Sequence, residues 1–456
     1  MASIDRVLHS AADTFEGFVE VLRGLVSQPS ISTRSEGIGE CVTAIVKVMR
    51  EAGVHTEVIE TGGHPAVLGE VAGSPGETTV LFYGHYDVQP PEPLEAWSSP
   101  PFEATIRGDR IYGRGVADNK GQLLCHIWAV RLWRETIGRL PITVKFLIEG
   151  EEEIGSPHLP DLVRAQRERL AADIVCTADG AMLPEHPTIY FGVRGLLYIE
   201  VVLRGAATDA HSGRLGNVLP QPALELVRLL GGMVGEDGLV TLPGFYDRIR
   251  PPSSAELALL DRIPFDRDAF LQEHGLTDSP IQSAGEYHRR LTYTPTFNIA
   301  GLASGYVGPG MKTIIPSSAV AKIDVRLVAS QDPDEVFALL TDAVSKRNPR
   351  AQVRRLAGVP PSRTDPSLPI CQDVIHSVRT SWDLEPVLVP AIGGTGPDFV
   401  FTQILGAPSI IIPYANHDES NHAPNENMRL ELIRAGIRTT AHIIDGLSRW
   451  RGGRPH

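Results

Sequence analysis

Glu149-Gly-Glu-Glu-Glu-Ile-Gly-Ser156 directly follows an apolar run, Ile142 to Ile148, that has the composition of a buried strand. Three consecutive carboxylates beside a core destabilise the fold when they have no positive partner, because burying an uncompensated charge is costly. We therefore expect a positive group at this strand end, and a metal ion is the simplest one. The rest of the chain is arranged to bring histidines and aspartates to the same point.

Side chains that bind metals also follow three other predicted strands, at the point where each strand ends. In an open α/β sheet, ligands bind beyond the carboxyl ends of the strands, so these side chains are expected to meet there. Asp118 lies between them in the sequence, just before a helix that starts near Lys120. The strand-end residues are His85 and Asp87 after Tyr83, Glu151, Glu152 and Glu153 after Ile148, Asp179 after Ala178, and His417, Asp418, Glu419 and His422 after Ile412.

The candidate ligands are numerous enough for two metal ions. One zinc ion takes three protein ligands and a water molecule. Five candidates are present, and five serve as six when one carboxylate bridges the two ions. Mixed imidazole and carboxylate ligands suit zinc, and cobalt or manganese would also fit. The five candidates are His85, Asp118, Glu153, Asp179 and His422.

Two acidic residues remain for other roles. Asp87 lies two residues from His85 and can accept a hydrogen bond from its imidazole. Glu152 neighbours a candidate ligand, and a carboxylate beside a metal-bound water can act as a general base. Glu151 is expected to be solvated, and His417 and Asp418 are expected to be loop residues or to support the ligands.

The order of predicted strands and helices indicates an α/β fold with an inserted second domain. Strands alternate with helices up to Ala178, which predicts a mixed, mostly parallel sheet of the phosphorylase/hydrolase-like type. From Leu197 to Leu356 the order is β-α-β-β-α-β, which is typical of a ferredoxin-like α+β domain. The predicted domains are 1–191 and 359–456 for the metal-binding part and 192–358 for the insertion. Residues 241–292 interrupt the insertion and have no predicted role.

Composition excludes several classes of protein. The net charge of -13 over 456 residues argues against nucleic acid as a partner. No apolar run approaches the roughly 20 residues that span a bilayer, and no secretory signal is visible. The four cysteines are scattered without a CxxC pair, which favours buried thiols in a reducing compartment. We therefore expect a cytoplasmic protein without a membrane partner.

Four stretches in this order resemble the M20 metallopeptidase family, whose members include carnosinase-type dipeptidases, aminoacylases, carboxypeptidases and desuccinylases. The dipeptidase branch is the most similar, because Lys312-Thr-Ile-Ile-Pro316, Arg326 and His422-Ala-Pro-Asn-Glu426 also match it. The four stretches are Gly84-His-Tyr-Asp-Val-Gln-Pro90, Gly113-Arg-Gly-Val-Ala-Asp-Asn-Lys-Gly121, Glu149-Gly-Glu-Glu-Glu-Ile-Gly-Ser156 and Asp209-Ala-His-Ser-Gly213.

The resemblance implies a role for each matched position. His85, Asp118 and Asp179 would bind one metal, and Asp118 would bridge it to a second metal held also by Glu153 and His422. Glu152 would be the general base, and Asp87 would orient His85. The peptide bond between Asp118 and Asn119 would be cis.

The resemblance also implies that the inserted domain acts as a lid and joins two copies into a homodimer. His211 would reach into the partner's active site and stabilise the oxyanion. Thr313, Arg326 and Thr395 would hold the carboxylate end and backbone of the substrate, and a guanidinium suits a carboxylate. Thr395 departs from the pattern of the dipeptidases, which carry serine there, so an added methyl group narrows that pocket.

The expected function is the hydrolysis of amide bonds in dipeptides or short peptides by two divalent ions, with a bridging water as nucleophile. Two alternatives remain open. The same chemistry would serve an N-acyl-amino-acid deacylase or desuccinylase, and a degenerate scaffold would bind metal without turnover. A serine hydrolase is disfavoured because no Gly-x-Ser-x-Gly elbow follows a strand.

Each candidate residue also has a purely structural interpretation. Asp118 could cap the following helix, and the acidic run could be a solvated loop. His211 beside Ser212 and Gly213 could belong to an ordinary turn, and Arg326 could be a surface cation. The shared position at strand ends and the ordered motifs favour the metal site.

Overall fold

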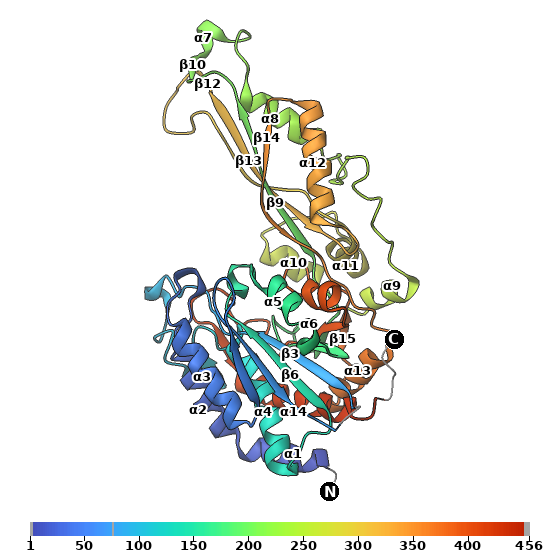
Figure 1. The fold of residues 1–456 in the computed structure, drawn as a ribbon. Helices are drawn as coiled ribbons and strands as arrows, with labels where there is room; N and C mark the ends of the chain where they lie inside the picture. Colours follow the sequence, from blue (N-terminus) through green and yellow to red (C-terminus); the bar gives the residue numbers. More distant parts are fainter. Residues whose placement is uncertain (1–2, 75–76, 451–456) are drawn as a thin grey trace. The chain divides into compact units, whose positions relative to one another are not determined.

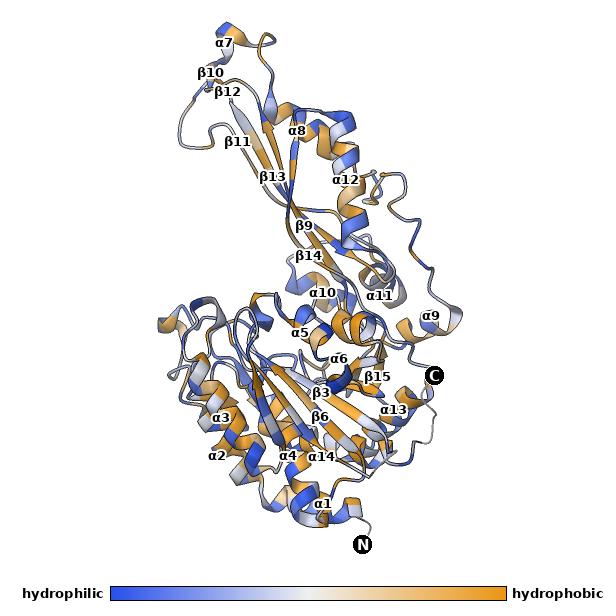
Figure 2. Cartoon of the chain, in the orientation of Figure 1, coloured by the Kyte–Doolittle hydropathy of each residue, from blue (hydrophilic) through white to orange (hydrophobic). Residues whose placement is uncertain are grey.

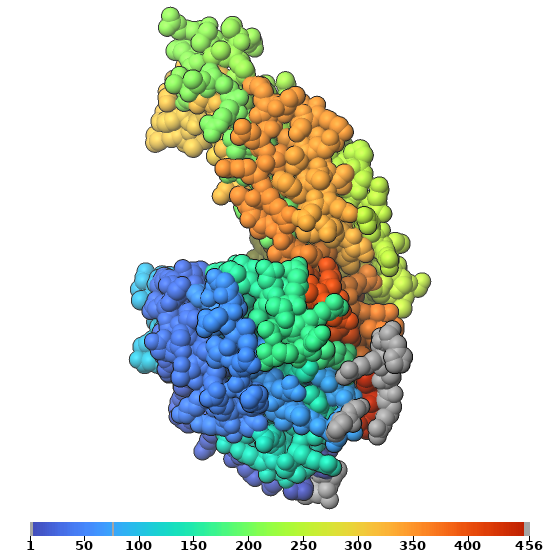
Figure 3. Space-filling view, in the orientation of Figure 1, coloured from blue at the N-terminus to red at the C-terminus, as the bar shows by residue number. Residues whose placement is uncertain are grey.

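The computed structural model describes residues 3–74 and 77–450 and contains two compact units (Figure 1). Unit 1 consists of Met1–Gly192, Arg363–Pro390 and Pro397–His456, and unit 2 consists of Val193–Ser362 and Ala391–Gly396. Unit 1 is therefore assembled from early and late parts of the chain. Its surface in Figure 3 includes early residues in blue and blue-green as well as late residues in red.

Unit 1 contains an eight-stranded mixed sheet in the order β1-β2-β6-β3-β7-β16-β8-β15. Strand β3 pairs in parallel with β6 and β7, and β16 pairs in parallel with β7. The predicted α/β fold with a mostly parallel sheet is confirmed. The strands are β1 (His55–Ile59), β2 (Ala66–Val71), β3 (Thr79–His85), β6 (Thr143–Glu149), β7 (Ile174–Thr177), β8 (Thr188–Tyr190), β15 (Val387–Val389) and β16 (Ser409–Ile411).

Both faces of this sheet are covered, which explains why its central strands β3 and β6 are largely hydrophobic (Figure 2). Successive residues of a strand point to opposite faces, so Phe82 belongs to one core cluster and Leu81 and Tyr83 to another. The helices on the Phe82 face are α1 (Ser3–Asp13), α2 (Phe15–Val26), α3 (Ile38–Glu51), α4 (Lys120–Ile137), α13 (Pro369–Trp382) and α14 (Leu430–Leu447). The Leu81 face is covered by α5 (Leu159–Ala165), α6 (Arg167–Leu170) and the π-helix η4 (Val400–Leu405).

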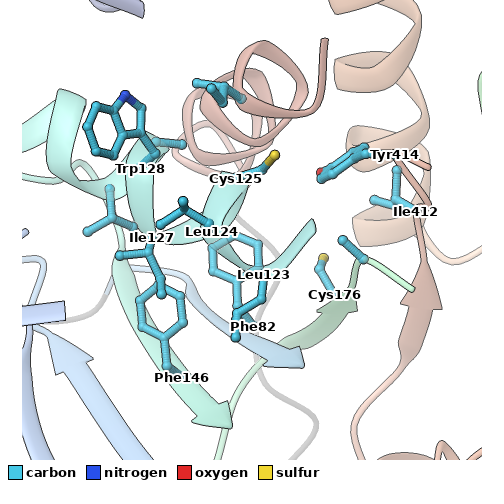
Figure 4. Packing of buried hydrophobic residues seen from close by; sticks show 14 of the residues in the cluster. Phe82, Leu123, Leu124, Cys125, Ile127, Trp128, Phe146, Cys176, Ile412 and Tyr414 are labelled. Carbon is cyan, nitrogen blue, oxygen red and sulfur yellow. The ribbon is translucent and has the colours of Figure 1, made fainter. Parts of the chain in front are cut away.

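Helix α4 lies in the middle of the larger core. Leu123, Leu124 and Ile127 pack over Phe82 and Phe146 of the sheet (Figure 4). Almost every residue from Lys120 to Val130 is buried, because other helices cover the sides of α4 that the sheet leaves free. A helix that is buried on all sides requires neighbouring elements around it. This packing fixes the start of α4 and therefore the position of Asp118 just before it.

Unit 2 contains a four-stranded antiparallel sheet in the order β11-β13-β9-β14, which is the ferredoxin-like order that the sequence predicts. Helices α8 and α12 share one core cluster with β9 and β13, so they cover one face of the sheet. The elements are β9 (Gly195–Arg204), α8 (Pro222–Gly231), β11 (Asn298–Ser304), β13 (Ser318–Leu327), α12 (Pro333–Arg347) and β14 (Gln352–Val359).

Residues 241–292, for which we predicted no role, contain most of three helices: α9 (Ser254–Leu260), α10 (Arg267–Glu273) and α11 (Ala284–Tyr293). Each of them begins at a residue whose side chain accepts a hydrogen bond from the first turn, and before α10 Asp266 accepts from Asp268 N and Ala269 N. Ser253 and Glu256 form a capping box before α9, and the Ser283 side chain accepts a hydrogen bond from Glu286 N before α11. None of the helices within the described residues has the length and apolar character of a membrane span.

His126 of α4 provides a test of this core through acid stability. Its ring stacks on Phe82 at 4.2 Å, and its Nδ1 lies 3.1 Å from Thr440 Oγ1. Burial lowers the pKa of His126 to about 3. As the pH falls below about 6.5, His126 is protonated in the unfolded chain but stays neutral in the folded chain. The free energy of unfolding therefore decreases.

We expect His126→Asn to remove this loss, because asparagine can replace the Nδ1 contact without titrating. The difference in unfolding free energy between wild type and variant should narrow by about 2 kcal/mol from pH 7 to pH 5. Urea denaturation in the presence of a chelator measures it without a contribution from metal loss. A difference that stays constant over this range would contradict the burial of a neutral histidine.

Candidate metal centre

The carboxyl ends of neighbouring strands carry the predicted ligands. Strands β6, β3, β7 and β16 are adjacent and parallel in the sheet, so they end at the same edge. His85 is the last residue of β3, Glu153 lies in the short 3-10 helix η3 (Glu152–Ile154) after β6, and Asp179 follows β7. His422 lies in the loop after β16. The structure therefore brings these residues to one edge, as the sequence predicts.

The five candidate ligands form two groups that share Asp118. The groups are His85, Asp118 and Asp179, and Asp118, Glu153 and His422. Within each group the candidate ligand atoms all lie within 4.8 Å of one another. Asp118 Oδ1 lies 2.9 Å from His85 Nε2, whereas Asp118 Oδ2 lies 3.2 Å from His422 Nε2. Each oxygen of Asp118 thus faces a different histidine, as in a carboxylate that bridges two metal ions.

The structural interpretation of Asp118 is wrong. The N-terminal cap position of α4 is Asn119, and no side chain makes a capping hydrogen bond there. Asp118 therefore directs both oxygens into the ligand groups. The peptide bond between Asp118 and Asn119 is cis, which confirms the expectation from the family resemblance.

His85 has an unsatisfied atom that fits a metal. Its Nδ1 lies 3.1 Å from the backbone oxygen of Asp87, while Nε2 is buried and has no well-oriented hydrogen bond. An imidazole that donates from Nδ1 presents the lone pair of Nε2 to a cation. Nε2 lies 2.9 Å from Asp118 and 3.8 Å from Asp179, and two ligands of a tetrahedral zinc ion are roughly 3.3 Å apart. The residues present therefore fit a divalent metal.

Asp87 contacts both His85 and the acidic loop. Its backbone oxygen, rather than its carboxylate, accepts the hydrogen bond from His85, although Oδ1 also lies 3.3 Å from His85 Nδ1. The carboxylate oxygens accept hydrogen bonds from the backbone N–H groups of Glu152 at 3.2 Å and Glu153 at 3.0 Å. Asp87 therefore fixes the backbone of the acidic loop relative to His85.

The expectation that Glu151 is solvated is wrong, because its side chain is only 6% exposed. It accepts a hydrogen bond from His64 N and pairs with His158 Nδ1 at 2.8 Å. Glu149 is also buried and accepts hydrogen bonds from the hydroxyls of Tyr83 and Ser156. The distant partners His64 and Tyr83 explain why sequence alone did not reveal these contacts. Both carboxylates anchor the loop that carries Glu152 and Glu153.

Glu426 is a residue of the site that sequence reasoning left without a role. Its buried carboxylate accepts hydrogen bonds from the backbone N–H groups of Gly115, Ala117 and Asp118 and pairs with Arg114 at 2.7 Å. Glu426 therefore holds the backbone that leads into the shared ligand. A small sheet also joins the segment that carries Glu426 to the segment that leads to Asp118. In it, β17 (Asn427–Arg429) pairs with β5 (Arg110–Tyr112), which pairs with β4 (Thr105–Arg107).

Electrostatics distinguish the acids of the centre. Burial, with the charges of Asp179, Asp118 and Glu153, raises the pKa of Glu152 well above its usual value, although His85 opposes the shift. Burial would also raise the pKa of Asp118, but hydrogen bonds from His422 and His85 hold it below its usual value. The pKa values of these two carboxyl groups are therefore shifted in opposite directions, and Glu152 is the more basic of the two.

The remaining predicted site residues lie in unit 2. His211 pairs with Ile314 between the two-residue strands β10 (Ala210–His211) and β12 (Ile314–Ile315), and its Nδ1 accepts a hydrogen bond from Gly213 N. Thr313 accepts one from Ser212 N, so it lies beside His211. Arg326 donates to Thr395 Oγ1 at 2.8 Å and pairs with Asp324, which the sequence analysis did not select.

The chain is similar to known proteins over most of its length. The sequence profile of peptidase family M20/M25/M40 matches residues 81–446, a range that includes every candidate ligand. The chain belongs to this family. Among its relatives is the human Beta-Ala-His dipeptidase, which is 31% identical over 80% of this chain and 74% of the human protein. The Cys-Gly metallodipeptidase of Schizosaccharomyces pombe is 27% identical over 98% of both chains.

Solved structures agree with this assignment to the M20 family. The M20 metallo-carboxypeptidase from Sulfolobus solfataricus superposes with a TM-score of 0.86 at 33% identity, covering 94% of this chain and 99% of that one. The protein is therefore a metal-dependent peptidase of the M20 family, with candidate ligands grouped at the edge of its larger sheet.

Proposed function

We propose that this M20 peptidase hydrolyses the amide bond of dipeptides or short peptides at a centre of two divalent metal ions. The observation that carries the proposal is the position of Asp118, whose two oxygens face His85 and His422 in separate ligand groups. The dipeptidases among the relatives support a dipeptide substrate. A single-metal centre would leave one of these ligand groups without a cation.

His85, Asp118 and Asp179 would hold one ion, and Asp118, Glu153 and His422 the other. The imidazole and carboxylate donors suit zinc, and manganese or cobalt would also fit. When bound, such ions lower the pKa of a shared water molecule and polarise the amide carbonyl.

Glu152 would accept the proton of that water and return it to the leaving amine. Its raised pKa favours this role, because the carboxylate must bind a proton and then release it. Asp87 holds the backbone N–H of Glu152 and thereby positions the carboxylate. Glu152 belongs to neither ligand group.

Residues of unit 2 would bind the substrate. Arg326 and Thr395, which are joined by a hydrogen bond, would hold its carboxylate end together with Thr313. His211 would donate a hydrogen bond to the carbonyl oxygen in the active site of a partner copy, so the proposal includes a homodimer. If the protein sediments as a single protomer at all concentrations, the proposed homodimer is contradicted. The four cysteines are unpaired and buried, which supports the proposed cytoplasmic location.

A substrate panel with metal restoration tests the function. The stripped protein should be inactive and should regain dipeptide hydrolysis with zinc, manganese or cobalt. The panel would contain dipeptides, longer peptides and N-acyl amino acids. Cleavage confined to N-acyl amino acids would favour the deacylase alternative, and release of only the C-terminal residue from longer peptides would indicate a carboxypeptidase. Metal binding without cleavage of any substrate would indicate a scaffold.

A further inference from the structure

Glu419 is a buried carboxyl group for which the proposed function has no use. It lies in the loop between β16 and β17, and the residue is 4% exposed. The hydrogen bonds that place it run through its backbone, from Glu419 N to Asn416 O and from Asn427 N to Glu419 O. Its Oε2 atom is buried and has no hydrogen-bond partner within the described part of the chain.

Neighbouring carboxylates do not share this property. Asp418 pairs with Arg110 and Arg429, and Glu426 pairs with Arg114 and backbone N–H groups. Burial and the nearby charge of Glu419 raise the pKa of Tyr190. The Tyr190 hydroxyl nevertheless donates its hydrogen bond to Ala181 O. The protein thus supplies partners for the adjoining acids and none for the buried Oε2 of Glu419.

The position of Glu419 places it at the metal centre. Its carboxyl group experiences the charges of Asp118, Asp179 and His422, although Glu419 belongs to neither ligand group. The bridge between Ala181 and Ala415 joins its loop to the segment that follows Asp179. A buried carboxylate oxygen that has no partner among the described residues, in a group that the charges of the candidate ligands reach, is suited to a cation that arrives with the substrate.

We propose that Glu419 binds the free α-ammonium group of the peptide substrate and thereby selects peptides over N-acyl amino acids. The inference rests on the proposed function, because it assumes that the amide bond is cleaved at this centre. An ammonium group has three N–H donors and a positive charge, which complement the unpartnered Oε2 of Glu419. The other carboxylates of the centre are already used as metal ligands, as the base, or by protein donors.

Glycyl-leucine and N-acetyl-leucine form a suitable pair of probes, because they differ only in the amino group on the carbon next to the amide carbonyl. The experiment compares kcat/KM for both compounds in wild type and Glu419→Gln. We expect the preference for glycyl-leucine to fall by about tenfold or more, as for the loss of a charge-assisted hydrogen bond. Most of the change should appear in KM. Glu419→Asp keeps the charge but retracts it, and should give an intermediate preference.

A binding measurement separates this inference from the proposed mechanism. In a Glu152→Gln background, calorimetric titration of the metal-loaded protein should show weaker binding of glycyl-leucine when Glu419 is also changed to Gln. The affinity for N-acetyl-leucine should change less. If wild type cleaves neither compound nor any other in the panel, the proposed function fails, whereas this titration still tests Glu419.

Asp418→Asn is the matched control, because it alters an adjacent acid whose partners are arginines, and it should leave the preference for glycyl-leucine unchanged. An equal decrease in kcat/KM for glycyl-leucine and N-acetyl-leucine in Glu419→Gln would overturn the inference. Loss of bound metal in that variant would also overturn it, since Glu419 would then be a ligand. Should Glu419→Gln fail to fold, an unchanged preference in Glu419→Asp would overturn the inference in the same way.

Discussion

Glu152→Gln is expected to lower kcat for dipeptide hydrolysis by about 10²- to 10⁴-fold, the usual contribution of a general base. The amide of glutamine keeps the size of the side chain but cannot accept the proton of the attacking water. The backbone of residue 152 remains held by Asp87, so the loop should keep its position. Steady-state kinetics with zinc-loaded protein measure the effect.

The metal content decides whether Glu152 acts as the base. Glu152 belongs to neither ligand group, so the variant should hold as much metal as wild type by elemental analysis. Glu151→Gln is the matched control, because glutamine can still accept from His64 N and donate to His158 Nδ1. It should retain activity to within about tenfold. Loss of metal in Glu152→Gln would show that the residue is a ligand.

Asp118→Asn is expected to remove both metal ions, because Asp118 is the one residue common to the two ligand groups. A neutral amide oxygen replaces a charged carboxylate and cannot hold two cations with equal strength. Elemental analysis after dialysis should find about two ions in wild type and close to none in the variant. Activity should be lost with the metal.

Asp179→Asn provides the comparison, because Asp179 belongs to one group alone and its loss should leave about one ion. Circular dichroism would verify that both variants are folded. Two ions retained in Asp118→Asn would contradict the bridging role, and equal losses in the two variants would show that Asp118 has no special position.

The sequence predicted those parts of the site that depend on local patterns. Apolar runs locate the strands, and the carboxyl ends of parallel strands must meet at one edge, so the positions of His85, Glu153 and Asp179 could be foreseen. The helices at 241–292 were missed because they are short, with seven, seven and ten residues, and so few turns carry little periodicity, although the Ser253 and Glu256 pair marks one start.

Contacts between distant segments could not be predicted. Glu426 holds the backbone before Asp118 only because β17 pairs with β5, and no local pattern reports such a pairing. The same holds for Glu151, whose partner His64 lies before strand β2. Glu151 is therefore buried, whereas its neighbour Glu152 is only partly buried, for reasons that lie elsewhere in the chain.

The place of β16 in the sheet has a consequence for biosynthesis. This late strand lies between β7 and β8, which are translated far earlier. Until the ribosome has released β16, the nascent sheet has two unpaired strand edges, which are prone to associate with other chains. The same segment carries the candidate ligand His422, so the proposed metal centre would be complete only after nearly the whole polypeptide has emerged.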